Sequence, residues 1–298
     1  MRHILSRFFA FSLLSLALTS CWADDTADLD DGAAFTSGCR VTEFNGYAPL
    51  ASRPVKIHYN IPAKGDMSRM PVLFVLPGLE RNAADYLQAW KSFSDSRLFM
   101  VFVLEYPKES YTNSQYIEGG MFENGRPVPA EQWSFSLIEP VFERIKSDTG
   151  NKMAKYDMWG HSAGAQFVHR YVTFMPAARV GRAVAANAGW YTLPDPDTDY
   201  PYGLRNSGFD DEPALRHLLS AELIVQLGTA DTSRDGLNTT PGAEAQGANR
   251  FARGNYYFST GERKAAAGGY NFGWTRVEVE GVAHEYAPMA ADAATLLY

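Results

Sequence analysis

The sequence has few cysteines, no cluster of basic residues and no apolar run long enough to cross a bilayer comfortably. Two cysteines in 298 residues are too few for a disulfide-rich scaffold, and their spacing supports neither a zinc site nor a cysteine nucleophile. No Lys/Arg-rich segment is present and the net charge is −7, so nucleic acid is not expected as a partner. A hydrophobic content of 46% can fill a large core, which excludes collagen-like, coiled-coil and disordered classes.

Residues 1–23 have the pattern of an export signal. A basic start is followed by the apolar run Phe8–Leu18, which is shorter than a membrane span. The tetrapeptide Leu18-Thr19-Ser20-Cys21 fits a bacterial lipobox, in which Cys21 becomes lipidated and anchors the chain to the membrane. Ordinary cleavage after Ala23 is the alternative. We therefore expect an exported protein, either a periplasmic or outer-membrane lipoprotein or a secreted one.

Both cleavage alternatives leave Cys39 as the one free cysteine of the mature chain, so no intramolecular disulfide is expected. Residues 24–38 are acidic, small and non-periodic, which predicts a flexible linker. Residues 39–298 are then expected to form one folded domain.

Strand and helix patterns alternate along this domain. The alternating Val55–Ile61 predicts a half-exposed antiparallel edge strand, whereas continuous apolar runs predict strands covered on both faces. These patterns indicate an α/β protein with a mostly parallel central sheet flanked by helices. The further strands expected are 71–76, 98–104, 156–159, 182–186, 222–227 and 275–280, and the main helices 82–93, 134–146, 163–175 and 288–297.

Two long stretches, 108–133 and 232–274, interrupt the alternation and are rich in Gly, Asn, Thr and aromatic residues. Connections of this length are usually functional or disordered. Their aromatic content favours ordered loops, whose rings either line a cleft or pack the loops onto the domain.

The segment Gly160-His161-Ser162-Ala163-Gly164 fits the pattern G-x-S-x-G. In a nucleophile elbow this serine sits on a sharp turn between a strand and a helix, and flanking glycines remove side chains that would collide there. The expected strand 156–159 precedes the segment and the expected helix 163–175 follows it. Ser162 is therefore the candidate nucleophile.

An activated serine needs a base that takes its proton. In the chain order serine, acid, histidine, the base follows the last strand. Of six histidines, only His284 has this position, just after the expected strand 275–280. Among the others, His58 is expected to be solvated, His169 lies on the helix after Ser162, and His217 lies on a surface helix.

The acid that orients the base should follow the preceding strand. Asp231 stands at the end of the strand expected over 222–227, and Asp235, four residues later, is the alternative. A developing oxyanion also needs backbone N–H donors. The candidates are Ala163, directly after Ser162, and Leu79 in the loop after strand 71–76, with Glu80 next in line.

With these residues the chain resembles the α/β-hydrolases. It is most similar to bacterial secreted esterases of the polyhydroxybutyrate-depolymerase and feruloyl-esterase type. The resemblance rests on Pro71–Gly78 with Arg81–Tyr86, and on three short segments, Gly160–Gly164, Gly228–Asp231 and Gly281–His284. Many members have His-Gly where this chain has Pro77-Gly78, which sets the oxyanion loop differently.

The resemblance implies a carboxylic-ester hydrolase that forms an acyl-enzyme on Ser162 with His284 and Asp231, and it implies no metal or organic cofactor. The expected partner is a small or polymer-linked ester. We also expect Glu80, His161, Asn187 and Trp190 to approach the substrate. A serine peptidase of the same fold and a non-catalytic binding protein are the alternatives.

Overall fold

The computed structural model describes residues 34–298. The predicted export signal, its candidate lipidation site Cys21 and most of the predicted linker lie outside the described residues. Near the end of that linker, Phe35 is buried, with its ring 5.0 Å from that of Tyr59 and 5.1 Å from that of Phe102. Packing onto the domain therefore begins before Cys39, where the linker was predicted to continue.

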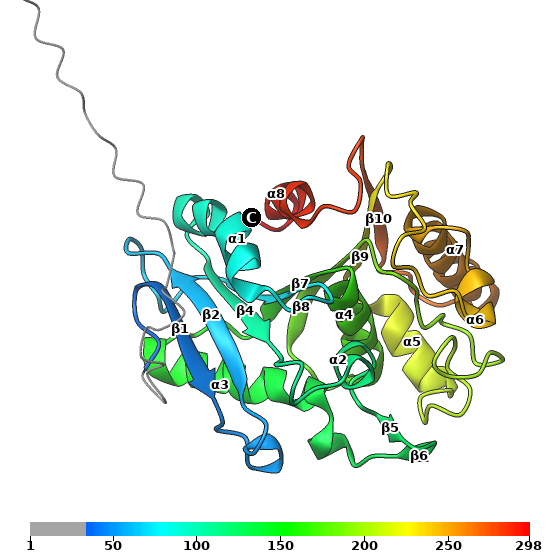
Figure 1. The fold of residues 1–298 in the computed structure, drawn as a ribbon, viewed down its shortest axis with the longest axis horizontal. Coiled ribbons are helices and arrows are strands. Elements are labelled where there is room, and N and C mark those ends of the chain that lie inside the picture. The colour runs from blue at the N-terminus through cyan, green and yellow to red at the C-terminus, as the bar shows by residue number, and fades with distance from the viewer. Residues whose placement is uncertain (1–33) are drawn as a thin grey trace, which may run out of the picture.

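An eight-stranded sheet crosses the centre of the molecule (Figure 1). Its order is β1-β2-β4-β3-β7-β8-β9-β10, with β1, β2 and β4 antiparallel to one another in turn and every other pair parallel. This arrangement confirms the predicted mostly parallel α/β sheet with an antiparallel lead-in. The strands are β1 (Gly38–Phe44), β2 (Val55–Ile61), β3 (Val72–Leu76), β4 (Met100–Glu105), β7 (Tyr156–His161), β8 (Val180–Ala186), β9 (Leu223–Gly228) and β10 (Thr275–Val279).

The prediction that Val55–Ile61 forms an edge strand is wrong. It is β2, the second strand, because β1 pairs with it along its full length. Its alternating pattern reflects one fully buried face, with Val55, Ile57 and Tyr59, and a partly exposed opposite face at Lys56 and His58. His58 of β2 is not simply solvated either, because its Nε2 lies 2.8 Å from a carboxylate oxygen of Glu105.

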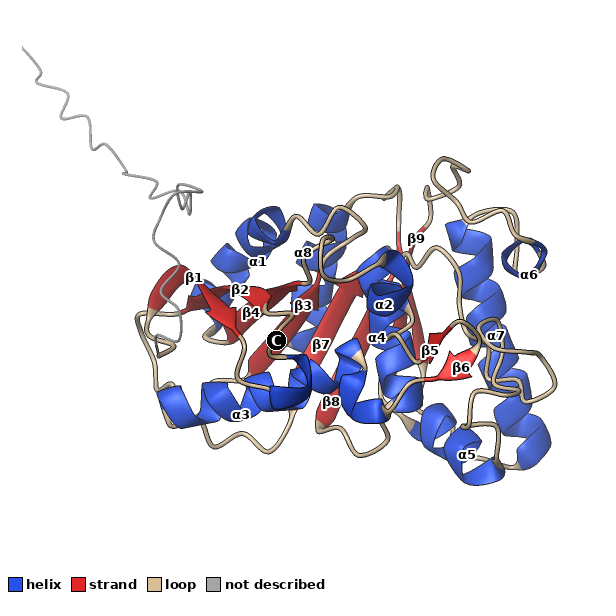
Figure 2. Ribbon diagram, turned by 60° about the horizontal axis from the view of Figure 1, so that its bottom comes forward, coloured by secondary structure: helices blue, strands red, loops and turns tan. Residues whose placement is uncertain are grey.

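Helices cover both faces of the sheet (Figure 2). Successive residues of a strand point to opposite faces, so Leu73 and Val75 of β3 pack with α1 and α8, and Phe74 packs with α3 and α4 on the other face. The helices are α1 (Ala83–Arg97), α2 (Asn113–Ile117), α3 (Ile138–Thr149), α4 (Ala163–Phe174), α5 (Glu212–Ser220), α6 (Pro241–Glu244), α7 (Arg250–Gly268) and α8 (Tyr286–Leu297).

The predicted loop 232–274 contains α6 and the 19-residue helix α7. Glycines at 254, 261 and 268 lower the helix propensity of this segment and conceal the helix in the sequence. Two of them lie against buried side chains: a Cβ at Gly254 would stand 2.2 Å from Leu227, and one at Gly261 would stand 2.6 Å from Trp274. The glycines therefore let α7 pack close to the domain.

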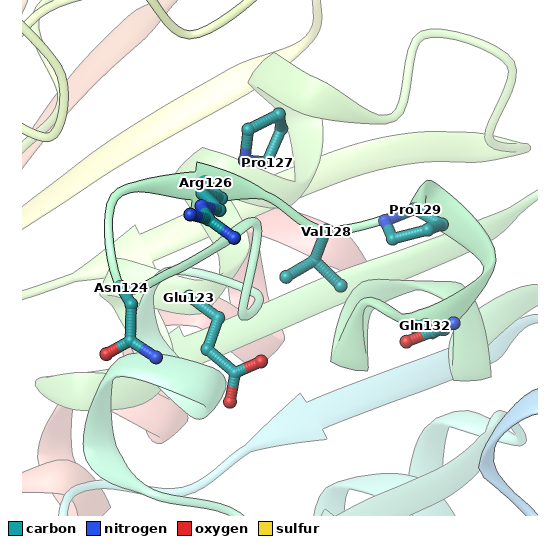
Figure 3. Close-up of a pocket in the computed structure, with 7 residues that line it drawn as sticks. All are labelled: Glu123, Asn124, Arg126, Pro127, Val128, Pro129 and Gln132. Carbon is teal, nitrogen blue, oxygen red and sulfur yellow. The ribbon is translucent and has the colours of Figure 1, made fainter.

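The other long stretch, 108–133, contains α2 and a small hairpin of β5 (Phe122–Glu123) and β6 (Arg126–Pro127), with 3₁₀ turns at Ala130–Gln132 and Ser134–Leu137. Many of its rings are buried, including Tyr111, Tyr116 and Trp133, so they pack the stretch onto the domain. A cavity of about 510 Å³ lies beside the hairpin (Figure 3). Its lining is Glu123, Asn124, Arg126, Pro127, Val128, Pro129 and Gln132.

Cys39 is disulfide-bonded, so the prediction of a free thiol is wrong. Cys39 was expected to be free because cleavage after Ala23 would remove Cys21, and lipidation would modify it. Between residues 34 and 298, no helix combines the length and apolarity that a bilayer crossing requires. The same residues hold no cluster of three or more His, Cys, Asp or Glu side chains placed to bind a metal ion.

Candidate active site

Ser162 lies on the sharp turn between β7, in the middle of the sheet, and α4. Its backbone has φ 56° and ψ −113°, a combination that is rare for a residue with a side chain and costs of the order of 1–3 kcal/mol. The turn is held by a hydrogen bond from its N–H to Ala186 O (2.9 Å) at the end of β8. The side chain thus projects from the carboxyl edge of the sheet, where ligands bind in open α/β sheets.

The two glycines of the motif are required by close backbone contacts. A Cβ at Gly160 would lie 2.2 Å from Gly164 O, and a Cβ at Gly164 would lie 1.8 Å from Leu76 O. Real Cβ atoms do not approach backbone atoms this closely, so α4 could not start directly beside β3 with any other residue at position 164. The glycines therefore fix the position of Ser162 against the loop that follows β3.

The structure brings Ser162, His284 and Asp231 into one hydrogen-bonded chain. His284 Nε2 lies 2.9 Å from Ser162 Oγ, and His284 Nδ1 lies 2.7 Å from Asp231 Oδ2. With the proton on Nδ1, the imidazole donates to the carboxylate and accepts from the hydroxyl. The Asp231 side chain is fully buried while that of His284 is 29% exposed, so solvent reaches the base but not the acid. Asp235, the alternative acid, does not join this chain.

The loop that carries His284 is attached to the end of β9 through Asn187. The Asn187 amide donates to Ala283 O (3.1 Å) and accepts from Gly228 N (2.8 Å). The residue is fully buried and has φ 51°, a left-handed conformation that asparagine tolerates better than most residues. Because both ends of its amide are engaged, Asn187 positions the His284 loop, and the substrate contact expected for it is not supported.

Two backbone N–H groups next to Ser162 are available for an oxyanion. Ala163 N belongs to the first turn of α4, where N–H groups have no partner within the helix, and Leu79 N makes no hydrogen bond to another residue among 34–298. The loop 77–79 passes close to Ser162, since a Cβ at Gly78 would lie 3.8 Å from Ser162 Cβ. Gly78 N is already bonded to the Tyr86 hydroxyl (3.0 Å), which leaves Leu79 N, with Glu80 N next to it, as the candidate donors from this loop.

His161 is buried between Tyr86 and His284. Its Nδ1 lies 3.1 Å from the Tyr86 hydroxyl, and its ring centre lies 4.7 Å from that of His284. Burial lowers the pKa of His161 well below its ordinary value, and the charges of His284 and Arg250 act in the same direction. The ring is therefore neutral and supports the imidazole of His284, so the substrate contact expected for His161 is not supported.

Tyr86 links this histidine to the loop after β3. Burial raises the pKa of Tyr86, so the hydroxyl keeps its proton; it accepts from Gly78 N and forms a hydrogen bond with His161 Nδ1. Its ring also stacks on that of Tyr286 at 4.4 Å. The sequence placed Tyr86 on a helix but gave no signal for this contact, which arises only when α1 packs beside β7.

The remaining predicted substrate contacts have different surroundings. Glu80 is exposed and pairs with Lys108 at 2.7 Å. Leu79, between Glu80 and Gly78, exposes 45% of its surface although it is apolar. Trp190 is nearly buried and lies over the Arg170 guanidinium at 4.1 Å, so only a small part of its ring can face a ligand.

A second residue that the sequence did not reveal is Arg250, the first residue of α7. Its Nη1 lies 3.6 Å from Asp231 Oδ1, and its side chain is only 8% exposed. Asn249 caps the helix by accepting from Ala252 N (2.8 Å). This cap was a sequence signal for the start of a helix, yet no pattern indicated that the next side chain would face Asp231.

No protein-family model matches the chain, and no curated protein is significantly similar to it. Solved structures are similar over most of its length. A poly(aspartic acid) hydrolase from Sphingomonas sp. KT-1 is 38% identical with a TM-score of 0.84, over 88% of this chain and 99% of that one. A poly(3-hydroxybutyrate) depolymerase from Bordetella parapertussis is 30% identical with a TM-score of 0.84, over 88% of this chain and 90% of that one.

More distant structures share the fold alone. A ferulic acid esterase is 11% identical with a TM-score of 0.56, over 88% of this chain and 97% of that one. Taken with the sheet order and the position of Ser162, the identities and coverage of the first two structures decide the family. The chain is a hydrolase that belongs to the α/β-hydrolases, in the esterase and depolymerase family of the poly(aspartic acid) hydrolase and the poly(3-hydroxybutyrate) depolymerase.

Proposed function

We propose that this protein is a serine hydrolase that cleaves carboxylic esters through an acyl-enzyme on Ser162. The observation that carries the proposal is the hydrogen-bonded chain from Ser162 Oγ through His284 to the buried Asp231, beside two backbone N–H groups. This combination provides a nucleophile, a base, an orienting acid and an oxyanion site, which together are what acyl transfer requires.

In the first step Ser162 Oγ attacks the ester carbonyl carbon, and His284 Nε2 takes the hydroxyl proton. The carbonyl oxygen becomes an oxyanion that accepts from Ala163 N and Leu79 N. Asp231 stabilises the imidazolium by accepting from Nδ1. The carbon–oxygen bond to the alcohol then breaks, His284 gives its proton to the leaving alcohol, and the acyl group stays on Ser162.

In the second step a water molecule attacks the acyl-enzyme while His284 Nε2 takes one of its protons. The same N–H groups stabilise the second oxyanion, and collapse of this intermediate releases the acid and returns the proton to Ser162. The first and the last proton transfer use the contact between His284 Nε2 and Ser162 Oγ that is 2.9 Å long in the free protein. The other two run between His284 Nε2 and the leaving alcohol or the attacking water.

A fluorophosphonate probe tests this proposal without knowledge of the substrate. The wild-type protein should form a covalent adduct at Ser162, identified by peptide mass spectrometry, and should hydrolyse a p-nitrophenyl ester. Ser162→Ala should lose the adduct and at least about 10⁴-fold of the activity. Equal labelling of the two proteins would refute the assignment of the nucleophile.

Hydrolysis of amides in an acidic polymer is a second candidate, because the relative with 38% identity is a poly(aspartic acid) hydrolase. Esters and amides are attacked by the same set of groups, and they differ in the leaving group that His284 must protonate. Three substrates separate the candidates: p-nitrophenyl esters of increasing chain length, poly(3-hydroxybutyrate) and poly(aspartic acid). Turnover of poly(aspartic acid) without turnover of the esters would favour the amide.

We further propose that the protein is exported. The support is the sequence of residues 1–23, with a basic start and an apolar run, and Cys21 is the candidate lipidation site. A lipid on Cys21 and an intrachain disulfide with Cys39 exclude each other, because each uses the Cys21 sulfur. Membrane fractionation of wild type and Cys21→Ser distinguishes anchoring from secretion. If Cys21 is lipidated, the wild type should be in the membrane fraction and Cys21→Ser should not.

A further inference from the structure

The second oxygen of the Asp231 carboxylate has an unusual environment. Oδ2 is bonded to His284, whereas Oδ1 has no hydrogen-bond partner among residues 34–298 and is buried. A buried carboxylate oxygen without a donor is costly, because burial removes its hydration. The guanidinium of Arg250 is the group that compensates for this loss, with Nη1 at 3.6 Å from Oδ1.

Arg250 is held in this place by its own contacts. Its Nη2 donates to Asp235 O (3.0 Å), and the N–H of the next residue, Phe251, donates to Asp231 O (3.3 Å). The start of α7 is therefore attached to the Asp231 loop by backbone and side chain together. Burial lowers the pKa of Arg250 while the Asp231 charge acts in the opposite direction, as expected when two buried charges depend on each other.

We propose that Arg250 is a positioning residue for Asp231: its guanidinium holds the buried carboxylate in the rotation that bonds His284, and its positive charge opposes protonation of that imidazole, which extends the pH range in which His284 can activate Ser162. The proposal rests on the proposed function of Ser162, His284 and Asp231. A cation on the far side of the carboxylate also weakens the attraction between Asp231 and a protonated imidazole. Removing that charge should therefore favour the protonated, inactive form of the base.

Other titratable groups surround His284 from the neighbouring elements. His161 on β7 is neutral because burial lowers its pKa, and Tyr86 on α1 and Tyr286 on α8 keep their protons because burial raises theirs. Glu285, the next residue in the chain, is exposed, and Asp235 contacts Arg250 through its backbone oxygen. Buried charge close to the base is thus carried by Asp231 and Arg250.

The experiment is the rate of fluorophosphonate labelling as a function of pH in wild type, Arg250→Gln and Arg250→Lys. In Arg250→Gln the midpoint of the acid limb should move to higher pH by about one unit, and the plateau rate should fall by about tenfold. Arg250→Lys keeps the charge and should keep the midpoint. The matched control is Arg253→Gln, one turn along α7, since Arg253 is also buried but bonds to Gly189 O and Gly247 O.

The outcomes separate this proposal from the function on which it rests. No labelling of wild type would refute both. Labelling of wild type with the same midpoint in Arg250→Gln would overturn the role of Arg250 and leave the function intact. A slower plateau with an unmoved midpoint, as Arg253→Gln should give, would show a merely structural role.

Discussion

The Tyr86 hydroxyl connects two parts of the site that the chain order keeps apart. It accepts a hydrogen bond from the loop after β3 and forms a second one with the ring of His161, which lies against the base. A single oxygen atom therefore couples the position of Leu79 N to the orientation of His284. Neither contact touches the expected substrate, so Tyr86 acts through the residues that it positions.

We predict that Tyr86→Phe lowers kcat by about tenfold and leaves KM nearly unchanged, because the oxyanion loop loses its anchor. Two buried polar groups, Gly78 N and His161 Nδ1, would also lose their partner, at about 1–3 kcal/mol of stability. Steady-state kinetics and urea unfolding measure the two effects. The phenylalanine ring can still stack on Tyr286, so a loss of stability with unchanged kcat would contradict the positioning role.

The residues of the proposed triad could be predicted from the sequence, because the order of serine, acid and histidine along the chain identifies them. Ser162 stands in a motif, and His284 and Asp231 follow strands in the sequence expected of the fold, so their meeting in space could be predicted. Tyr86 and Arg250 could not, because their roles depend on which side chain faces which after helices pack on the sheet. The burial of Asn187 and His161, for which substrate contacts were expected, could not be predicted for the same reason.

Among the elements, α7 shows how a helix can be hidden by the residues that allow it to pack. Gly261 lies at a point where the helix meets the face of Trp274. The indole is fixed, since its Nε1 donates to Leu218 O (2.9 Å) and its ring stacks on Tyr257 at 4.6 Å. Close approach of the helix thus outweighs the low helix propensity of glycine.

Gly261→Ala is expected to destabilise the protein by about 1–3 kcal/mol through overpacking, although glycine to alanine within a helix normally stabilises by up to about 1 kcal/mol. The sign of the change in unfolding free energy, measured by urea denaturation, decides between the two effects. A double variant with Trp274→Leu should recover part of the alanine penalty. Stabilisation by Gly261→Ala alone would contradict the close contact.

The strands were easier to predict than this helix. Runs such as 71–76 and 98–104 are apolar throughout because helices cover both faces, and both became strands, β3 and β4. The first strand, β1, was not identified, since Gly38–Phe44 mixes small, charged and apolar residues at the border of the sheet. Because β1 was not predicted, β2 was assigned to the edge of the sheet, so one missed strand led to the wrong position for the next.

On the scale of the whole molecule, the core contains histidines that must stay neutral. His169 on α4 is fully buried, with Nδ1 2.9 Å from Ala165 O and Nε2 accepting from Thr192 N at 3.1 Å. Burial lowers the pKa of both His169 and His161 well below the ordinary value. Folding therefore depends on two uncharged imidazoles in the interior.

We expect the unfolding free energy to be highest above about pH 6.5 and to decrease as the pH falls below it. The folded-state pKa values lie under the unfolded value of about 6.5, so below pH 6.5 protons bind preferentially to the unfolded chain. Each histidine then contributes a slope of up to about 1.4 kcal/mol per pH unit. Urea unfolding between pH 5 and 8 measures how the unfolding free energy depends on pH, and His169→Gln should reduce this slope. A stability independent of pH over this range would contradict the prediction.

The order of the strands also gives the nucleophile and the base unequal protection against thermal fluctuation. Ser162 follows β7 in the middle of the sheet, whereas His284 follows β10, which ends the sheet and pairs with β9. Peripheral segments open transiently at a much lower free energy than central strands. Brief detachment of residues 275–284 would separate the base from the serine while the fold persists. We therefore expect activity to be lost on heating at a lower temperature than the one at which the domain unfolds.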